Sequence, residues 1–251
     1  PAAARDLAGD PLPDAAHQGF GLLARRGVQT VVRETMREGL TYEQAFVAPS
    51  GKHKYEAGTY IYACGPWLKK LFPELLGDKI NPTRQEVFYF GTKPGEAAFR
   101  IPQMPCWVDG GDSIYGLPDI ENRGFKLAID EHGPTVDPDT QDRAPTKAFV
   151  DRARAYLARR FPSLKDAALT QAEVCPYENT ANGDYLIDKH PDHANVWLLG
   201  GGSGHGYKHG PALAEYFAAA LEGKGRIDPM FSLAAKPEIS AAQRHSTIPQ
   251  K

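Results

Sequence analysis

The sequence predicts a mixed fold, α/β in one part and α+β in another, and three observations support this prediction. Residues 147–161 repeat apolar side chains at helical spacing, with Thr146 placed to cap this helix and Pro162 to stop it. Residues 80–130 contain short strand-like segments separated by Pro and Gly, which is typical of an antiparallel sheet. Residues 195–221 predict a buried strand, a glycine-rich turn and a helix in immediate succession.

The composition bounds the size and class of the protein. With 251 residues, 41% hydrophobic residues and only 3 Cys, the chain can bury a core without disulfides, in one large or two modest domains. A net charge of −2 gives no electrostatic reason to expect nucleic acid or an anionic membrane as a partner. No apolar run approaches the roughly 18 residues of a membrane-spanning helix, and the start has no signal-peptide pattern. We therefore expect a soluble, cytoplasmic protein with no membrane or nucleic-acid partner.

The first 80 residues predict elements of both kinds: a helix (14–26), a strand (28–32), a hairpin or irregular meander (42–54), a buried strand (59–64) and a short helix (67–71). Asp14 can cap the first helix, and the strand after it is rich in β-branched residues. The buried strand is apolar and aromatic and is closed by a Gly-Pro turn. Pro73 is expected to end the short helix.

The middle of the chain predicts five short strands, at residues 86–90, 98–101, 106–109, 113–116 and 125–130. Side chains alternate between the two faces of a strand, so Phe125, Leu127 and Ile129 share one face and Lys126 lies on the other. Two interpretations of Lys126 stay open. It is either an exposed lysine on the solvated face of the sheet or a lysine that points into a cleft opposite a ligand.

The glycine-rich turn at residues 200–210 is the most informative local feature. Glycine lets the backbone approach a ligand closely, and the following helix start offers free amides to an anion or an electron-rich ring. No offset fits G-x-G-x-x-G, and His205 stands where G-x-S-x-G requires its second glycine. The turn could serve only close packing of strand on helix, but the bulky polar residues His205 and Lys208 favour a ligand platform.

Two further features concern cysteine and histidine. Cys175 is either a small buried hydrophobe, as we expect for Cys64 and Cys106, or a nucleophile that pairs with His205 for acyl transfer. The His-Pro-Asp-His segment at residues 190–193 predicts a solvated turn, so we expect no metal site there.

Six motifs occur in the order found in one known family: Ala63-Cys64-Gly65-Pro66-Trp67, Pro82-Thr83-Arg84-Gln85, Tyr115-Gly116-Leu117-Pro118, Gly124-Phe125-Lys126, Cys175-Pro176-Tyr177 and Gly202-Ser203-Gly204-His205-Gly206-Tyr207-Lys208. With them the chain resembles the monomeric sarcosine oxidase and N-methyltryptophan oxidase branch of the FAD-dependent amine oxidoreductases. Each motif alone is weak, whereas six in order over residues 63–231 make a specific match.

The resemblance implies a partial Rossmann-type FAD-binding domain and a substrate domain built on an antiparallel sheet. The FAD-binding part would comprise residues 1–80 and 172–232, and the substrate domain residues 81–171. Residues 233–251 are polar and have little to pack, so they predict a mobile tail.

The resemblance also implies FAD as the cofactor, with a covalent thioether through Cys175. Lys126 would face the flavin where oxygen is activated, because a cation there stabilises the negative charge that develops on oxygen. Lys208 would help to hold the substrate carboxylate, and Tyr177 and His205 would line the pocket. The residues expected to contact the flavin are Gly65, Pro66, Trp67, Gly202, Ser203, Gly204, Gly206, Tyr207 and Lys208.

The implied reaction moves a hydride from the carbon next to a secondary amine nitrogen to the flavin. The imine then hydrolyses, and oxygen reoxidises the flavin to give hydrogen peroxide. The partners would be a small-molecule amine and oxygen. Asp130 departs from the sarcosine-oxidase-like pattern, which has His four residues after the lysine. Lys-x-x-x-Asp-Glu is more similar to the fructosyl-amine oxidase branch, so a glycated amine is an alternative substrate.

One part of the family pattern has no counterpart in the sequence. The family opens with a G-x-G-x-x-G turn that cradles the pyrophosphate of FAD, and no such turn is present. Because the chain also begins at Pro1 rather than Met, we interpret the nucleotide-binding unit as absent. The alternative function is therefore a non-catalytic remnant, or a module that needs a second chain or a missing segment to complete its FAD site.

Overall fold

The computed structural model describes residues 49–50, 53–54 and 58–239. The predicted helix at residues 14–26 and the predicted strand at residues 28–32 lie outside the described residues, as does the last part of the predicted tail.

The chain divides into two compact units. Unit 1 contains the described residues up to Asn81 and from Glu178 onwards, and unit 2 contains the residues from Pro82 to Tyr177. For comparison, the expected domain boundaries were 80/81 and 171/172.

Unit 1 contains mostly short elements: β1 (Pro49–Ser50), β2 (His53–Lys54), β3 (Tyr60–Tyr62), the 3-10 turn η2 (Gly65–Trp67), α4 (Leu68–Leu71), α5 (Pro73–Leu76), β9 (Leu186–His190), β10 (His193–Gly200), η4 (Tyr207–His209), α7 (Gly210–Leu221) and η5 (Pro229–Phe231). β1 and β2 pair antiparallel, as a hairpin would. The predicted short helix is present and ends at Leu71, before Pro73. Pro73 then begins the separate helix α5, because proline fits the first turn of a helix.

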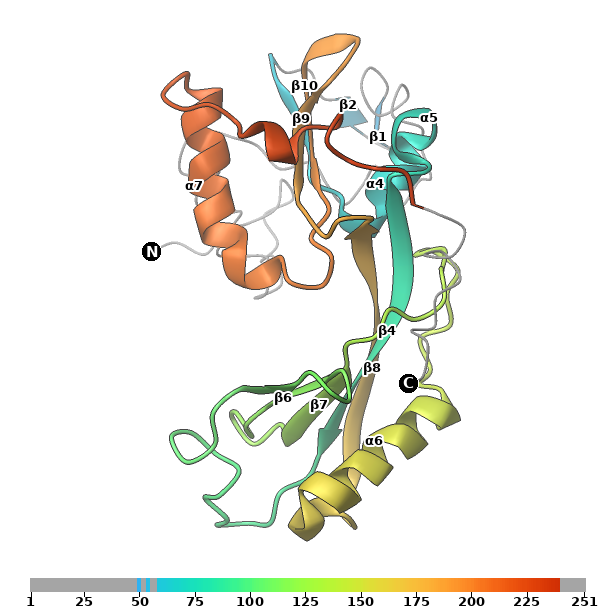
Figure 1. Ribbon diagram of the computed structural model, residues 1–251, viewed down its shortest axis with the longest axis vertical. Helices are drawn as coiled ribbons and strands as arrows, with labels where there is room; N and C mark the ends of the chain where they lie inside the picture. The colour runs from blue at the N-terminus through green and yellow to red at the C-terminus, as the bar shows by residue number, and fades with distance from the viewer. Residues whose placement is uncertain (1–48, 51–52, 55–57, 240–251) are drawn as a thin grey trace. The chain divides into compact units, whose positions relative to one another are not determined.

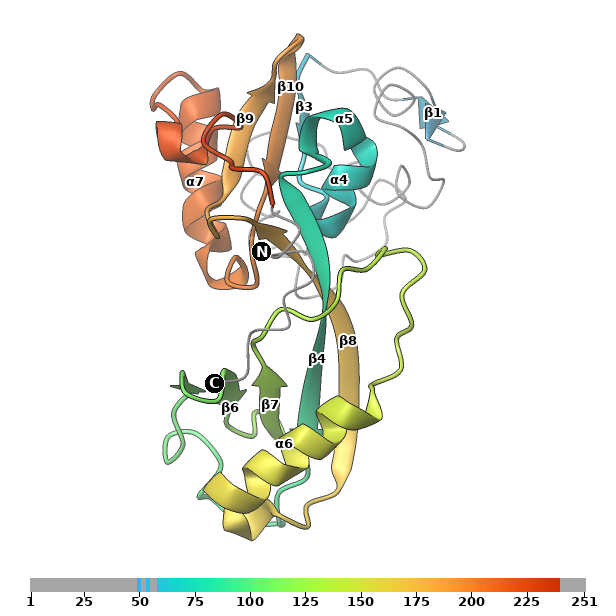
Figure 2. The same ribbon diagram turned by 45° about the vertical axis from the view of Figure 1, so that its right-hand side comes forward.

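The sheet of unit 1 has the order β3-β10-β9, with β3 parallel and β9 antiparallel to β10. Figures 1 and 2 show α7 on one side of this sheet and α4 with α5 on the other. Trp197 of β10 meets Phe217 of α7 at 5.2 Å between ring centres. The neighbouring Val196 and Leu198 point the opposite way and pack in one core with Leu68 of α4. Helices on both faces of a partly parallel sheet are the arrangement expected of a partial Rossmann-type domain.

Unit 2 is built on a five-stranded sheet in the order β5-β6-β7-β4-β8, in which β6 pairs antiparallel with β5 and β7, and β7 pairs antiparallel with β4. The elements are β4 (Ile80–Phe90), β5 (Trp107–Asp109), β6 (Ile114–Leu117), β7 (Phe125–Ile129), α6 (Lys147–Arg160), η3 (Pro162–Leu164) and β8 (Leu169–Thr180). The first residues of β4 and the last residues of β8 belong to unit 1. This antiparallel sheet confirms the fold class predicted for the middle of the chain.

Two parts of the strand prediction were wrong. Residues 98–101 form turns, in which the Arg100 amide donates to the Ala97 carbonyl at 3.0 Å, and Pro102 directly after them lacks the amide that a ladder needs. The long strand β8 was not predicted, because Pro176 lies within it. β8 is at the edge of the described sheet, where a strand tolerates proline.

The two faces of this sheet differ in character. One face is apolar and packs under α6, which crosses it in Figure 2. Its buried side chains include Phe88, Phe90, Phe125, Leu127 and Ile129, packed with Ala153, Tyr156 and Leu157 of the helix. The other face carries a smaller cluster of Val87, Tyr89, Tyr115 and Ala128. The predicted alternation along β7 is therefore present, and Lys126 lies on the second face.

A buried charged pair holds the start of α6. Arg84 Nε lies 2.8 Å from Glu86 Oε1, and the same guanidinium donates to the carbonyls of Asp142 and Ala144. Glu86 Oε2 accepts the Thr146 amide at 2.9 Å. Thr146 occupies the N-cap position as predicted, but its side chain makes no capping hydrogen bond. The start of the helix is fixed by a carboxylate from β4 instead.

The predicted tail packs further than its polar composition suggested. Lys236 is buried, and its ammonium donates to the Met230 carbonyl at 2.6 Å. Ile239 is also buried, and its amide donates to the Asp78 carbonyl at 2.6 Å. Residues 233–239 are thus part of the packing of unit 1, because one aliphatic side chain and one lysine stem find apolar contacts that the composition alone does not show.

Candidate functional site

Lys126 lies on the second face of the unit 2 sheet, between two tyrosines. Its ammonium nitrogen is 5.7 Å from the centre of the Tyr115 ring and 6.0 Å from that of Tyr89. Tyr89 is the direct cross-strand partner of Lys126, on β4. Burial lowers the pKa of Lys126, while Cys175 and Glu173 act in the opposite direction. Lys126 is thus partly buried and lies beside two aromatic rings, and its position in a cleft opposite a ligand stays a prediction.

A chain of hydrogen bonds borders this lysine. The Tyr177 hydroxyl donates to Asp130 Oδ1 at 3.3 Å, and Tyr115 is hydrogen-bonded to Tyr177. Because a carboxylate only accepts, the Tyr177 oxygen is left to accept the Tyr115 proton. Burial raises the pKa of both tyrosines, so both hydroxyls stay protonated at neutral pH. Tyr115 and Tyr89 are candidate site residues to which the sequence analysis assigned no role, although Tyr115 begins the Tyr-Gly-Leu-Pro motif.

Cys175 is partly buried on β8, in unit 2 with Lys126. Burial raises the pKa of its thiol, whereas Lys126 lowers it. A cation that interacts with the thiol favours the thiolate needed for any covalent attachment. Cys64 behaves as the predicted buried hydrophobe, with its pKa raised to about 12 by burial and then by Glu178. Cys106 is exposed, contrary to the same prediction, because it lies in the loop before β5.

The glycine-rich turn lies in unit 1 and is held from within. The amides of Gly201 and Gly202 donate to the side chain of Glu178, and the Ser203 amide donates to the Glu178 carbonyl at 2.9 Å. Ser203 Oγ in turn accepts the Thr180 amide at 3.2 Å. The sequence predicted a ligand platform at this turn and the following helix start, and in the structure an internal carboxyl group accepts two of the turn amides. Sequence reasoning did not identify Glu178 as a site residue, because its only distinguishing feature is its position directly after the Cys-Pro-Tyr motif.

His205 has both ring nitrogens in hydrogen bonds within unit 1. Its Nε2 lies 3.0 Å from the Gly183 carbonyl oxygen, and its Nδ1 lies 3.2 Å from the Tyr185 hydroxyl. The same hydroxyl lies 2.5 Å from His209 Nδ1. A carbonyl only accepts, so Nε2 of His205 carries a proton and Nδ1 accepts from Tyr185 in the neutral ring. No ring nitrogen is left to accept the Cys175 proton, so this geometry does not favour the thiol hydrolase interpretation.

Lys208 and Tyr207 are exposed at the end of the glycine turn. The Lys208 ammonium donates to the His205 carbonyl at 3.2 Å. Tyr207 is 77% exposed, so its ring is available to a ligand or a further segment of protein. Ser203 has a φ of 46° and Gly204 a φ of 80°, and these left-handed conformations form the turn before η4.

Several residues fit the approach of a large planar cofactor. Gly65 has a φ of 55°, and a Cβ built there would meet no atom of the described residues within 4 Å. A Cβ at Gly202 would meet nothing closer than 3.7 Å. These two glycines leave open space beside the Gly-Pro-Trp turn and the glycine turn, as close approach of a ligand requires.

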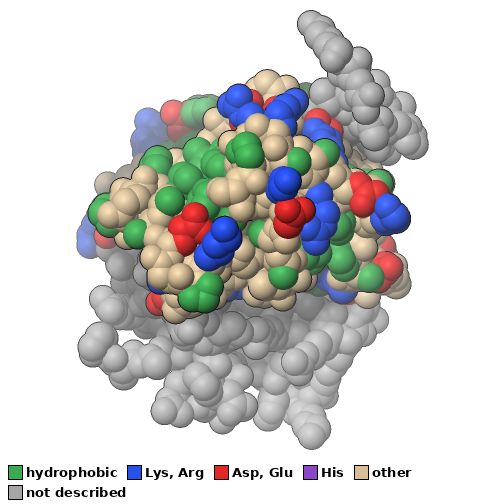
Figure 3. Space-filling model, turned by 90° about the horizontal axis from the view of Figure 1, so that it is seen from below, with side chains coloured by type: hydrophobic (Ala, Val, Ile, Leu, Met, Phe, Trp, Pro, Cys, Tyr) green, Lys and Arg blue, Asp and Glu red, His purple; other side chains and the backbone are tan. Residues whose placement is uncertain are grey.

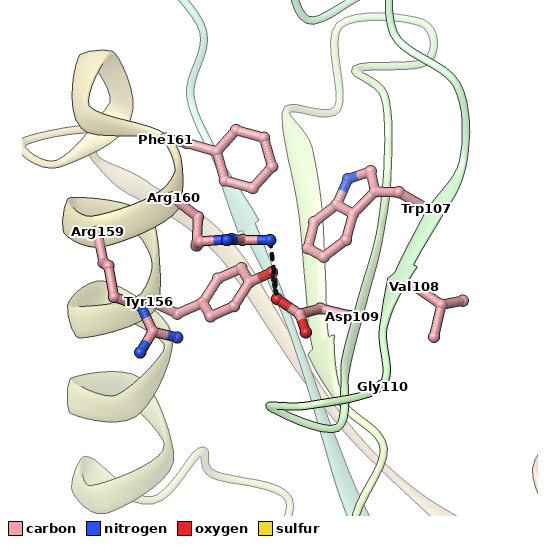
Figure 4. Close-up of a pocket in the computed structure, with 8 residues that line it drawn as sticks. All are labelled: Trp107, Val108, Asp109, Gly110, Tyr156, Arg159, Arg160 and Phe161. Carbon is pink, nitrogen blue, oxygen red and sulfur yellow. Dashed lines mark hydrogen bonds and ion pairs between the residues drawn. The ribbon is translucent and has the colours of Figure 1, made fainter.

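A pocket of about 550 Å³ lies on the other face of the unit 2 sheet, under the end of α6. Figure 4 shows the Asp109 carboxylate facing the Tyr156 hydroxyl and the end of Arg160, with Trp107 nearby. The Tyr156 hydroxyl donates to Asp109 Oδ2 at 3.0 Å, and Arg160 lies 3.3 Å from the same oxygen. Asp109 and Arg160 thus pair within the pocket, whereas Arg159 pairs with Asp112 outside its lining. Lys126 lies on the opposite face, so we do not assign the pocket to the cofactor.

Charged side chains elsewhere among the described residues also form pairs of opposite charge. On the face drawn in Figure 3, basic and acidic side chains alternate over the coloured residues. Arg152 pairs with Glu131 at 2.6 Å and Lys147 with Asp151. Such a surface of mixed sign gives no strong field for an anionic polymer.

The predicted solvated turn at residues 190–193 was wrong for its first histidine. His190 is buried, with its ring 4.8 Å from that of His193 and 5.9 Å from that of Phe72. It is buried because it ends β9 above the α4–α5 layer. Within the described residues, no three His, Cys, Asp or Glu side chains are grouped as metal ligands.

The Rossmann-type layers of unit 1 and the antiparallel sheet of unit 2 define a flavin-dependent oxidoreductase fold. The family described as "FAD dependent oxidoreductase" matches residues 13–220, so the chain belongs to this family. The match confirms the predicted family and FAD as its cofactor. No helix in the described part of the chain is long and apolar enough to cross a membrane.

Curated relatives carry two enzyme names. The chain is 31% identical over 235 residues to monomeric sarcosine oxidase from Streptomyces avermitilis, covering 89% of this chain and 60% of the relative. It is 30% identical over 176 residues to N-methyl-L-tryptophan oxidase from Salmonella arizonae, covering 67% of this chain and 45% of the relative. The chain thus spans about half the length of the curated relatives it matches.

Solved structures with the same fold include fructosyl amine:oxygen oxidoreductase (Amadoriase I) from Aspergillus fumigatus, with a TM-score of 0.60 and 22% identity over 72% of this chain and 44% of that one. A thermally stable mutant of fructosyl peptide oxidase gives a TM-score of 0.63 and 24% identity, covering 76% of this chain and 48% of that one. These likenesses establish the fold.

Proposed function

We propose that this chain carries the substrate side, and part of the cofactor side, of an FAD-dependent oxidase that acts on a secondary amine or an N-substituted amino acid. The observation that carries the proposal is the partly buried Lys126 between Tyr89 and Tyr115, on a sheet face that also bears Tyr177. The names of the relatives support the amine class of substrate.

A bound FAD would take the hydride from the carbon next to the amine nitrogen and pass electrons to oxygen, giving hydrogen peroxide. The task of Lys126 is to place a positive charge where negative charge develops on oxygen. In a partly buried site this charge is screened less than in water, so its effect on the barrier is larger. Cys175 on β8 would carry the covalent link, with Lys126 lowering the pKa of its thiol.

Substrate binding is assigned to the hydrogen-bonded tyrosines. Tyr177 and Tyr115 place hydroxyl groups next to their own aromatic rings. Such a combination of polar and apolar groups suits a small amino acid with an N-substituent. Asp130, which accepts from Tyr177, adds an exposed acceptor. It would favour a substrate with additional hydroxyl or cationic groups, such as a glycated amine. Lys208 remains the candidate for the substrate carboxylate, and His205 acts through the shape of the glycine turn.

The second candidate function is a partner-dependent or non-catalytic relative that lacks a complete FAD site. The absence of G-x-G-x-x-G in the sequence favours it. In that case a second chain or a further segment supplies the pyrophosphate site.

Hydrogen peroxide release tests the proposal. Purified protein is incubated with FAD, oxygen and either sarcosine, N-methyl-L-tryptophan or a fructosyl amino acid, and peroxide is measured with a coupled peroxidase. We expect peroxide with at least one of these amines and none with the corresponding primary amine. FAD binding without peroxide from any of the three contradicts the oxidase proposal. Failure to bind FAD favours the second candidate.

A further inference from the structure

Glu178 is a buried carboxyl group with no role in the chemistry proposed above. It follows Tyr177 near the end of β8, and 8% of the residue is exposed. Its Oε1 atom is buried and has no hydrogen-bond partner among the described residues. Burying a carboxyl oxygen without a hydrogen-bond partner costs free energy, and this cost must be offset by other interactions of the same residue.

Glu178 binds three consecutive amides of the glycine turn. Its side chain accepts from Gly201 and Gly202, and its backbone carbonyl accepts from Ser203 at 2.9 Å. A row of backbone amides is a typical anion site, so an internal carboxylate is the matching occupant. One residue therefore fixes the path of the turn directly after β10.

Side chains larger than glycine would not fit at the start of the turn, where Glu178 and its neighbours lie close to the backbone. A Cβ at Gly200 would lie 2.4 Å from Glu178 Oε1 and 2.8 Å from Leu68 Cδ2. Gly201 has a φ of 72°, and a Cβ there would lie 2.8 Å from a Thr180 methyl group. Gly200 is thus explained by the need to admit Glu178, and Gly201 by its left-handed φ and the close approach of Thr180, whereas a Cβ at Gly202 would meet nothing closer than 3.7 Å among the described residues.

We propose that Glu178 is a positioning residue that sets the conformation of the glycine turn through the hydrogen bonds its carboxyl group accepts from the backbone amides of the turn. The ionised carboxylate binds the two amides more strongly than the neutral acid, because charge-assisted hydrogen bonds are shorter and stronger. The consequence for the flavin rests on the proposed function, but the control of the turn does not.

The surroundings of Glu178 support a titration of its carboxyl group near neutral pH. Burial raises its pKa to about 8, and the amides of Gly201 and Gly202 act in the opposite direction. Cys64 is the titratable group that faces it from the β3–η2 junction, and its pKa of about 12 keeps it a neutral thiol when Glu178 titrates. Leu68 of α4 and Gly200 of β10 add no charge, and Ser203 and Thr180 contribute only hydroxyl groups.

Amide signals of the turn test the proposal. The full chain is labelled with ¹⁵N-glycine and titrated from about pH 6 to pH 10 without added FAD. The variant Gly202→Ala identifies the Gly202 signal. We expect the Gly201 and Gly202 amide protons to move downfield along one curve with its midpoint near pH 8. Glu178→Gln, which keeps an acceptor but cannot ionise, should give flat curves, and the exposed Glu215→Gln should titrate like the wild type.

Two results would overturn the proposal: flat curves in the wild type, or an unchanged titration in Glu178→Gln. If Glu178→Gln does not fold, ¹³C-glutamate labelling of the wild type decides. One carboxyl carbon must then titrate near pH 8, and its absence refutes the proposal. Because no FAD is added, a chain that fails to bind flavin leaves this test intact, so the two proposals fail separately.

Discussion

The ammonium nitrogen of Lys126 lies 5.7 Å from the centre of the Tyr115 ring, across two neighbouring strands of the unit 2 sheet. A cation over an aromatic face is held in place by the ring quadrupole, and burial adds to the strength of that contact. The contact keeps the lysine on the sheet face, and Tyr177 and Cys175 lie on β8, which is separated from β7 by β4. Lys126 is accordingly the residue on which the oxygen-activating role is placed.

Lys126→Met should slow reoxidation of the reduced flavin by oxygen at least 100-fold, a typical loss for removal of one electrostatic stabiliser. Reduction by the amine should change far less, because hydride transfer creates no negative charge on oxygen. Stopped-flow measurement of the two half-reactions separates these effects.

Lys189→Met is the matched control, since Lys189 also lies over an aromatic ring, 5.0 Å from the centre of Trp197 in unit 1. This variant should leave both half-reactions unchanged. Equal slowing of the two half-reactions in Lys126→Met would remove the role assigned to the lysine.

Glu178 should make the stability of the fold depend on pH. Its pKa is about 8 in the folded chain against an ordinary value of 4.5. A carboxyl group with a raised pKa contributes stability that is complete below the unfolded value and is lost as pH rises through the folded value. The wild type should therefore lose stability between about pH 4.5 and pH 8. Glu178→Gln should lose less over the same range, as measured by urea unfolding. Parallel curves for the two proteins would contradict this assignment.

The buried pair of Arg84 and Glu86 should dominate the stability of the α6 attachment. Glu86→Ala leaves a buried guanidinium without its carboxylate and frees the Thr146 amide, so it should lower the free energy of unfolding by about 3 kcal/mol. Asp151→Ala breaks only an exposed pair with Lys147 and should cost about 0.5 kcal/mol or less. Denaturant unfolding of both variants gives the comparison. Similar losses in the two would show that the buried network does not hold the helix.

Cys175→Ser should abolish any covalent flavin. After acid precipitation, the wild-type pellet should stay yellow and the Cys175→Ser pellet should be colourless. Cys106→Ser changes an exposed thiol and should leave the pellet yellow. A colourless wild-type pellet from a protein that binds FAD would refute the thioether, and colour retained in Cys175→Ser would place the link elsewhere.

The parts of the fold that follow local rules could be predicted from the sequence. The alternation of Phe125, Leu127 and Ile129 placed Lys126 on the second face, and the spacing of apolar residues gave α6 almost to its ends. β8 was missed because Pro176 is unfavourable in most strands, and only its edge position allows it there. Strand propensity at residues 98–101 was overruled by the turns that precede Pro102.

The site could be predicted only where a motif marks it. Lys126 and Cys175 stand in motifs, and the structure places them in one unit, where they interact. Glu178 and Tyr185 do not stand out in the sequence, because their partners Gly201 and His205 lie about 20 residues away and meet them only after folding. For the same reason the sequence could not show that two amides of the glycine turn are already bound.

Anaerobic reduction of the flavin tests the central claim most directly. Protein loaded with FAD is mixed with sarcosine, N-methyl-L-tryptophan or a fructosyl amino acid in the absence of oxygen, and the visible flavin absorbance is followed. We expect bleaching by at least one of these amines and recovery of the colour when oxygen is admitted. FAD that stays oxidised with all three amines, in a protein shown to bind it, would refute the proposed amine oxidation.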